Sequence, residues 1–373
     1  MTNWFRQIPF SADHSSQWRE RWEYSPNGIT ERSFDVCVKA GKSLDILSLK
    51  GRDLNEVCKY SDLLKKSALK LYNKSANART LHECPICHAV LDNAAVELTV
   101  FDVPYVRCKR CGHVCVSAPP AGEVLDDLFT ESEDHSSTYI DRRALEIRMA
   151  QIVVPKIDWC REIFSSRAGR LPGSVIDVGA GGGHFLAGAL RCGMTVEGFE
   201  LSRTSRNFAF EAFDLHLRDD DFLTSSCGPT DLVTFWGLLE YVLRPRDFIA
   251  AARKKLSSDG MLVIEVPRVD ALGTLVQAME NAVVARHMDP TSHINGFSDE
   301  SICTVLVEEG FAPVAAWYFG MDAYELCIQI ALRSGGVGSF AMLAQFIPVV
   351  QQALDRGRQC DDIIIAAVPM ECS

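Results

Sequence analysis

A glycine-rich turn between a short apolar run and a helical pattern is the feature that most constrains this chain. A short apolar run that begins at Val175 ends in Asp177 and fits a buried strand. Glycines follow at Gly179, Gly181, Gly182 and Gly183, and a helical pattern begins at His184. Glycine tolerates the positive φ of a tight turn and leaves the backbone open to a ligand. The stretch therefore predicts a parallel strand, a ligand-contacting turn and a helix.

The spacing of the glycines separates two classes of cofactor. Dinucleotide-binding turns follow G-x-G-x-x-G, and the third glycine counted from Gly179 would fall at position 184, which is His184. The pattern found is instead Asp177-x-Gly179-x-Gly181-x-Gly183. A carboxylate at the end of the strand would repel a pyrophosphate. An ordinary strand–helix turn without a ligand is the alternative interpretation.

Further strands that end in acids follow in order. Thr195–Glu200 is a predicted second strand, and Glu200 lies 17 residues after Gly183, near the interval of about 20 at which an acid reaches ribose hydroxyls. A short third run, 215–217, precedes Asp219, Asp220 and Asp221. A fourth run, 231–236, ends in Trp236, and a fifth covers 261–267. Strands that alternate with helices predict a doubly wound parallel sheet.

This order of motifs resembles the class I methyltransferases that depend on S-adenosylmethionine (SAM), over about residues 175–267. The resemblance implies an α/β fold with a Rossmann-like, seven-stranded, mainly parallel sheet. It implies that an Asp of the 219–221 stretch accepts a hydrogen bond from the adenine amino group and that a neighbouring apolar side chain covers the ring. The cofactor-binding residues it indicates are Asp177, Gly179, Gly181, Gly183, Glu200, Leu201, Asp219, Asp220 and Trp236.

Four cysteines form two closely spaced pairs before this core. Cys84 and Cys87 are separated by two residues, as are Cys108 and Cys111, with twenty residues between the pairs. Two such knuckles complete a tetrahedral metal site, and the alternating segments between them are typical of a zinc ribbon. Since all four ligands are cysteine, we expect a closed, structural zinc site. An iron site of rubredoxin type and free thiols are the alternatives.

The elements outside these motifs suggest three parts. We predict a helical N-terminal segment at 1–80, notably 54–72, a zinc ribbon at 81–119, and a methyltransferase domain at 120–373. Within the last part, periodicity predicts helices at 141–164, 245–255, 271–285 and 299–309, the last capped by Ser298. It predicts strands at 315–319 and 362–368, while 326–332 is compatible with a strand or a helix.

Charge and hydropathy bear on partners and location. Residues 1–80 carry a net charge of +5 and residues 120–373 a net charge of −15, within a total of −11. A strongly acidic half binds nucleic acid poorly, because phosphate contacts supply most of that affinity. No apolar run is long enough to span a membrane, and the N-terminus lacks the order of a signal peptide. We expect a cytoplasmic enzyme with a small-molecule acceptor and no membrane partner; a homo-oligomer is compatible with the sequence.

A cysteine ribbon combined with a SAM core is typical of a smaller group of methyltransferases. A four-cysteine ribbon before a SAM core resembles bacterial methyltransferases that act on sugar nucleotides and on natural-product or surface-polysaccharide intermediates, over about residues 84–368. The C-terminal half shares His293-Ile-Asn, Glu309-Gly-Phe311 and Gly320-x-Asp322 with them. In the sugar C-methyltransferases of this group a Glu-His pair follows the fourth strand. Here Glu240 matches and Tyr241 departs, which leaves C- and O-methylation both open.

Methyl transfer requires a positioned nucleophile and a group that takes its proton. Our candidates for the catalytic residues are His293 first, then Tyr241 and then Glu240. His184 is expected to contact the carboxylate end of SAM or to have no ligand. Two other functions stay open: an RNA base methyltransferase with a zinc module, and a non-catalytic SAM-fold protein whose ribbon mediates assembly.

Overall fold

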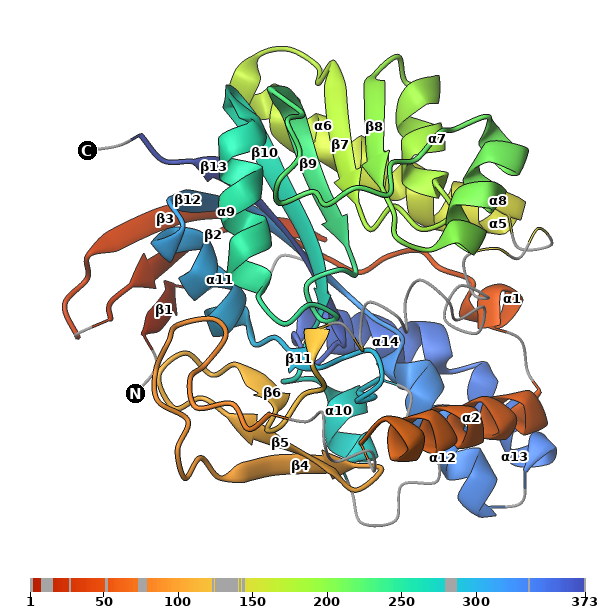
Figure 1. Ribbon diagram of the computed structural model, residues 1–373. Helices are drawn as coiled ribbons and strands as arrows, with labels where there is room; N and C mark the ends of the chain where they lie inside the picture. Colours follow the sequence, from red (N-terminus) through yellow and green to blue (C-terminus); the bar gives the residue numbers. More distant parts are fainter. Residues whose placement is uncertain are drawn as a thin grey trace.

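The computed structural model describes residues 3–7, 16–26, 28–50, 53–72, 79–122, 124, 140, 142, 145–278, 287–334 and 336–371. Within these residues one sheet of nine strands forms the centre of the molecule (Figure 1), in the order β1-β2-β3-β12-β13-β10-β9-β7-β8. The strands are β1 Trp4–Gln7, β2 Gln17–Tyr24, β3 Arg32–Ala40, β7 Ser174–Val178, β8 Thr195–Phe199, β9 Thr230–Trp236, β10 Leu256–Pro267, β12 Phe311–Phe319 and β13 Asp362–Pro369.

The middle of this sheet is parallel, as predicted. β8, β7, β9 and β10 pair in parallel, and β13 then pairs antiparallel with β10 and with β12. Successive side chains of a strand point to opposite faces. In β10, Leu262 and Ile264 pack with residues of α9 (Pro245–Lys255) and α11 (Asp299–Glu308), whereas Met261 and Val263 pack with residues of α6 (Val154–Ala168) and α7 (His184–Arg191). The fold is therefore a three-layer α/β/α arrangement.

The N-terminal strands correct one prediction. β1, β2 and β3 extend the sheet, because β3 pairs in parallel with β12. The predicted helical segment at 1–80 therefore holds for α2 (Leu54–Tyr72) but not for these three strands. Glu20 explains the error. It is 3% exposed, accepts hydrogen bonds from the indoles of Trp18 and Trp22 at 2.6 and 2.8 Å, and pairs with Arg358. A buried carboxylate in the middle of the run hides its period-two hydrophobic pattern.

The number of strands also differs from the expected seven. The predicted third strand at 215–217 contributes a single bridge, Arg218 to Phe199, whereas β1–β3 add three strands at the other edge. The remaining predicted strands are present as β7, β8, β9, β10, β12 and β13. The segment 326–332, which the sequence left open, lies in helix α12 (Asp322–Ser334).

The helices follow the predicted pattern where the structure describes them. The predicted helix at 141–164 corresponds to α5, η2 and α6, and that at 271–285 to α10, with 279–285 lying outside the described residues. Ser298 caps α11 as predicted, since its Oγ accepts the Ser301 N–H at 3.0 Å. The other helices are α1 Ile46–Lys50, α5 Leu145–Arg148, the π-helix η2 Met149–Val153, α8 Arg203–Phe213, α10 Leu272–Gln277, α13 Val337–Ala344 and α14 Ile347–Arg356.

A second, four-stranded sheet carries the cysteines. Its order is β11-β6-β5-β4, with β4 Val96–Val100, β5 Val103–Arg107, β6 Val114–Val116 and β11 Asn295–Gly296. β11 comes from the C-terminal half of the chain, so this sheet is assembled from two distant segments. The four cysteines, together with Leu91, belong to the same hydrophobic cluster as β10 and α11. The division of the chain into domains at residues 80 and 119 stays a prediction.

Helix α2 packs on the C-terminal helices. It lies alongside α12 and α13 in Figure 1, and Leu54 and Val57 of α2 pack with Ala323 and Tyr324 of α12. In the part of the chain that the structure describes, no helix has the length and apolar character needed to cross a membrane.

Candidate functional site

The glycine turn has the conformation that the sequence predicts. Gly179, Gly181 and Gly183 have φ angles of +70°, +53° and +74°, a region that side chains rarely adopt. A Cβ atom on Gly183 would lie 3.0 Å from the Cβ of Ala209, and one on Gly179 would lie 3.1 Å from Cδ1 of Leu238. Side chains are thus excluded at these two positions, and the turn reaches the loop that follows β9.

Glu200 holds this turn from the neighbouring strand. One carboxylate oxygen, Oε2, accepts the N–H of Gly181 at 2.7 Å, and the other, Oε1, accepts the N–H of Ser202 at 2.8 Å. Burial raises the pKa of Glu200, and the two backbone donors oppose the shift. A carboxylate oxygen accepts more than one hydrogen bond, so each oxygen keeps a lone pair for a ribose hydroxyl.

Asp177 lies beneath the turn. It is 1% exposed, and its Oδ1 accepts the hydroxyl of Thr234 of β9 at 2.7 Å. Burial raises the pKa of Asp177 to about 7, against the lowering effects of Thr234 and the Lys156 ammonium. A ligand cation placed here would favour the ionised carboxylate, because an opposite charge stabilises the charged form.

The acidic stretch after residue 217 lies next to Glu200. The Glu200 N–H donates to the Arg218 carbonyl at 2.8 Å, and Asp220 accepts from Arg218 Nε at 2.7 Å. Asp219 pairs with Arg206 at 3.2 Å, and the side chain of Asp219 is 72% exposed. The structure therefore brings Glu200, Asp219 and Asp220 to one edge of the sheet.

The apolar residues expected near the cofactor fall in different places. Leu201 is 44% exposed beside Glu200, whereas Phe222 is 3% exposed and packs edge-on to Phe199 in the core. Phe222 thus does not supply the apolar cover expected next to the acidic stretch. His184, at the start of α7, stacks on Phe208 with ring centroids 5.6 Å apart, and burial lowers its pKa to about 4, so it is a neutral packing residue.

These residues fit SAM. The three positive-φ glycines form a turn without side chains, Glu200 keeps acceptor capacity for ribose hydroxyls, and Asp177 is placed to favour a nearby cation. SAM carries a sulfonium and an ammonium group and no phosphate, which suits a site lined with carboxylates. When bound, it supplies an electrophilic methyl group.

A second group of candidates lies after β9. The ring of Tyr241 meets the ring of His293 edge-on, with centroids 5.5 Å apart, and the Glu240 carbonyl accepts the Asn295 N–H at 3.1 Å. The three predicted catalytic residues are therefore neighbours, although their segments are about fifty residues apart in sequence. Leu238 of this loop is also the residue that Gly179 faces, which joins the group to the cofactor turn.

His293 is oriented by a backbone carbonyl. Its Nδ1 lies 2.6 Å from the His287 carbonyl oxygen, which can only accept, so Nδ1 carries the proton. Burial lowers the pKa of His293, and the ring is neutral at pH 7. Nε2 is then left with a lone pair, which is the form a general base requires.

Glu240 is buried without a full set of partners. It is 3% exposed, and among the described residues its Oε2 has no hydrogen-bond partner. Burial, with a contribution from the charge of Glu265, raises the pKa of Glu240 to about 8. The carboxyl group is therefore protonated near pH 7 and can donate a hydrogen bond.

The raised pKa of Glu240 predicts a pH-dependent stability. Because the folded-state pKa lies above the unfolded value of 4.5, Glu240 stabilises the fold fully below about pH 4.5, and this contribution is lost as the pH rises towards 8. In the Glu240→Gln variant this component is absent. Urea unfolding at several pH values should show the wild type losing roughly 3–5 kcal/mol relative to the variant across this range. Parallel stability curves for the two proteins would contradict the assignment.

Sequence reasoning missed a buried ion pair at the same edge. Lys156 of α6 pairs with Glu265 of β10, and the Lys156 ammonium lies 4.5 Å from the ring centroid of Trp236. Trp236 sits at the end of β9, and its Nε1–H is buried without a partner among the described residues. Lys156 precedes the glycine motif on a helix with no signature of its own, so no signal in the sequence marked it.

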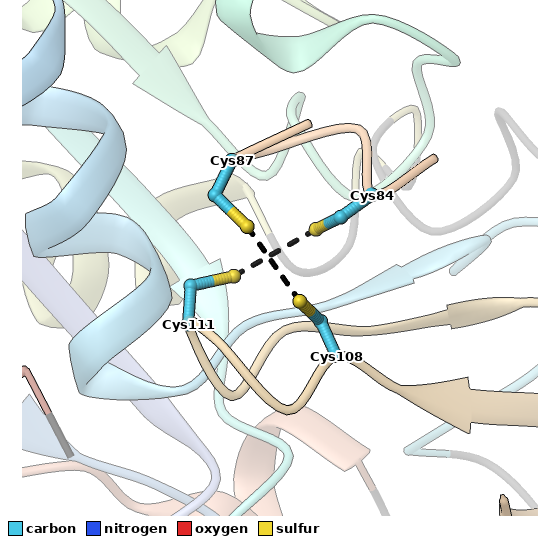
Figure 2. Close-up of side chains that lie close together, drawn as sticks. All are labelled: Cys84, Cys87, Cys108 and Cys111. Atoms are coloured by element: carbon cyan, nitrogen blue, oxygen red, sulfur yellow. Dashed lines mark hydrogen bonds between the residues drawn. The ribbon is translucent and has the colours of Figure 1, made fainter. Parts of the chain in front are cut away.

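The four cysteines converge, as Figure 2 shows. The Sγ atoms of Cys84 and Cys111 are 3.7 Å apart, those of Cys87 and Cys108 are 3.5 Å apart, and all four lie within 4.8 Å of one another. Tetrahedral zinc with Zn–S bonds of about 2.3 Å places its sulfurs about 3.8 Å apart. The buried four-thiolate set therefore fits a structural zinc ion, with each predicted ligand in place.

The two knuckles have the local geometry of metal-binding turns. In the first, the Cys84 N–H donates to the Ala89 carbonyl at 2.9 Å. In the second, the Gly112 N–H donates to the Cys108 carbonyl at 2.9 Å, and Gly112 has a positive φ, +74°. Arg110 joins the knuckles by donating to the Cys87 carbonyl at 3.0 Å. These turns hold the thiols together through backbone hydrogen bonds.

The fold is α/β, and its central parallel strands lead into a turn of positive-φ glycines that fits SAM. Residues 157–316 match a family described as a methyltransferase domain, and these residues contain the glycine turn, Glu200 and the loop after β9. The match shows a methyltransferase domain over these residues, and a cluster of four cysteines precedes it in the chain. No curated protein matches the chain.

Several solved structures share the arrangement at low identity. Magnesium protoporphyrin IX methyltransferase from Synechocystis, solved with S-adenosylhomocysteine (SAH), is 14% identical, with a TM-score of 0.44, and the match covers 67% of this chain and 100% of that one. The plantazolicin methyltransferase BpumL with SAH is 12% identical (TM-score 0.44, coverage 66% and 94%). Geranyl diphosphate C-methyltransferase from Streptomyces coelicolor is 15% identical (TM-score 0.39, coverage 64% and 87%).

Proposed function

We propose that this protein transfers the methyl group of SAM to a hydroxylated small molecule, in particular a nucleotide-linked sugar or a related natural-product or polysaccharide intermediate. The observation that carries the proposal is a pair of buried polar atoms that lack a partner among the described residues, Trp236 Nε1 at the end of β9 and Glu240 Oε2 in the loop that follows. A buried polar group without a partner is costly, and it favours a ligand that supplies one. Acceptor hydroxyls would satisfy both atoms.

The proposed roles follow from the states of the side chains. Nε2 of His293 accepts the proton of the nucleophile, protonated Glu240 donates a hydrogen bond to the acceptor, and Tyr241 fixes the plane of the His293 ring by its edge-on contact. Asp177, the glycine turn, Glu200, Leu201 and the 219–220 stretch bind SAM. The negative charge of residues 120–373 favours a small acceptor over RNA, whose phosphates would be repelled.

The test has two stages. Calorimetry should give a Kd for SAM and for SAH on the order of micromolar. A panel of nucleotide sugars is then incubated with the protein and SAM carrying an isotope-labelled methyl group, and mass spectrometry should find one labelled methyl on one acceptor. Undetectable binding of both SAM and SAH would refute the proposal, and labelling of RNA instead of any sugar nucleotide would replace its acceptor class.

A further inference from the structure

One side chain from the C-terminal half joins the cysteine ribbon to the candidate acceptor loop. Asn295 of β11 is 2% exposed, and every polar atom of its side chain has a partner. Its Nδ2 donates to the carbonyls of Leu239 and Val242, at 3.2 and 2.7 Å. Its Oδ1 lies 3.0 Å from Nε2 of His113, the residue between the second knuckle and β6. The amide thus forms hydrogen bonds both to the loop after β9 and to the ribbon.

The directions of these hydrogen bonds are fixed by their partners. Carbonyl oxygens only accept, so Nδ2 must face Leu239 and Val242, and Oδ1 must then face His113. Oδ1 also only accepts, which makes His113 Nε2 the donor. Both Nδ2 hydrogens are used on the loop, and the backbone N–H of Asn295 adds a third bond, to the Glu240 carbonyl at 3.1 Å. Asn295 therefore binds residues 239–242 at three points.

The ribbon in turn holds the segment that carries Asn295. β11 pairs antiparallel with β6, with Asn295 opposite Cys115, and the Val116 N–H donates to the Ile294 carbonyl at 2.9 Å. The hydroxyl of Tyr105 donates to the His293 carbonyl at 2.9 Å. The Ser298 hydroxyl donates to the carbonyl of Cys111 at 3.3 Å. The segment 293–298 is thus attached to the ribbon at His293, which is the candidate base, at β11, and at Ser298, which caps α11.

We propose that Asn295 is a positioning residue that sets the conformation of the 237–242 loop, and that the metal-bound ribbon keeps Asn295 in place through His113 and β6. The inference deepens the proposed function, on which it rests for the role of the loop. The ribbon then also determines the conformation of the 237–242 loop, in addition to being a stable unit itself. It fixes the backbone on which Glu240 and Tyr241 stand, whereas the cofactor turn is held by Glu200 and meets this loop at the Leu238 side chain.

The test is hydrogen–deuterium exchange of the full chain, which needs no acceptor. In Asn295→Asp a carboxylate faces two carbonyls, and in Asn295→Ala these carbonyls lose their donors. Either variant should raise the exchange rate of peptides covering 237–242 at least about tenfold, while peptides covering β7 and the calorimetric Kd for SAM stay within about twofold of wild type. The Ser298→Ala variant is the matched control. It loses the cap of α11 and one bond to the ribbon, but the hydrogen bonds of its hydroxyl go to Ser301 and Cys111 and not to the loop. Since His113 and the β6 pairing still hold Asn295, its loop exchange should not change.

Two further arms test the link to the ribbon. His113→Ala should raise loop exchange, and His113→Gln, which retains an N–H donor, should restore protection at least in part, with one zinc per chain in both. Removal of zinc from the wild type by a chelator should deprotect 237–242 together with the ribbon. Unchanged loop exchange in both Asn295 variants would overturn the positioning role, and a chelated protein with an exposed ribbon but a protected loop would overturn the link to the metal. If the wild type does not bind SAM, that result would instead contradict the proposed function.

Discussion

Replacing Glu200 by alanine should raise the Kd for SAM about 100-fold while leaving the chain folded. The variant loses the acceptor expected to bind the ribose hydroxyls, and it releases the N–H groups of Gly181 and Ser202 that shape the turn. Hydrogen bonds to a charged group contribute about 1.5–3 kcal/mol each, and 2.7 kcal/mol corresponds to a factor of about 100. Calorimetry with SAM and with SAH measures the effect.

Two variants of similar size sharpen this experiment. Glu200→Gln keeps one acceptor oxygen and should weaken SAM binding only about tenfold. Glu197→Ala removes an acid of β8, three residues before Glu200, whose side chain pairs with Arg218 and not with the glycine turn. This variant should leave the Kd unchanged. Wild-type affinity in Glu200→Ala, or an equal loss in Glu197→Ala, would remove Glu200 from the cofactor site.

Loss of the zinc ligands should have the largest effect on stability. Structural zinc contributes about 10–16 kcal/mol to the folding of small zinc-binding peptides, well above the 0.5–3 kcal/mol of an ordinary substitution. Cys108→Ser should therefore abolish zinc binding and unfold the ribbon, whose core is shared with β10 and α11. The measurements are metal content by mass spectrometry, where we expect one zinc per chain, and thermal unfolding with and without a chelator.

The matched control is a cysteine that is equally buried but ligates no metal. Cys303 of α11 is 1% exposed, and Cys303→Ser should cost about 1–3 kcal/mol while retaining one zinc per chain. Iron in the purified protein would favour a rubredoxin-type site instead. Stoichiometric zinc in Cys108→Ser would show that the four thiols are not the ligand set.

The sequence predicted those parts of the site that short spacings determine. The glycine turn, Glu200 and the two cysteine pairs each depend on residues within one turn or one strand–turn–helix unit. Their geometry therefore follows from local backbone requirements such as the positive φ of Gly183 and Gly112. The parallel pairing of the central strands also followed from a local regularity, the alternation of strands and helices, since parallel strands need crossover connections between them.

The parts that the sequence did not predict depend on contacts between distant segments. Asn295 belongs to the His293-Ile-Asn motif, which resembles other methyltransferases. Its partners His113 and Leu239, however, lie about 180 and 56 residues away in sequence. Lys156 forms its buried ion pair with Glu265, which is 109 residues further along the chain, so the pair cannot be recognised from the residues around Lys156. The N-terminal strands were not predicted for the same reason. Glu20 can be buried in β2 because Arg358, a residue far along the chain, pairs with its carboxylate.

The pairing of β3 with β12 has a consequence for how the chain is made. β3 ends at Ala40 and its parallel partner begins at Phe311, about 270 residues later. At a synthesis rate of about 5–20 residues per second, the N-terminal hairpin waits roughly 15–55 s for that partner to leave the ribosome. During this time the edge of β3 that β12 will occupy has unpaired backbone groups, a template for association with other chains. β3 thus gains its second neighbour in the sheet only after about 270 further residues have been synthesised.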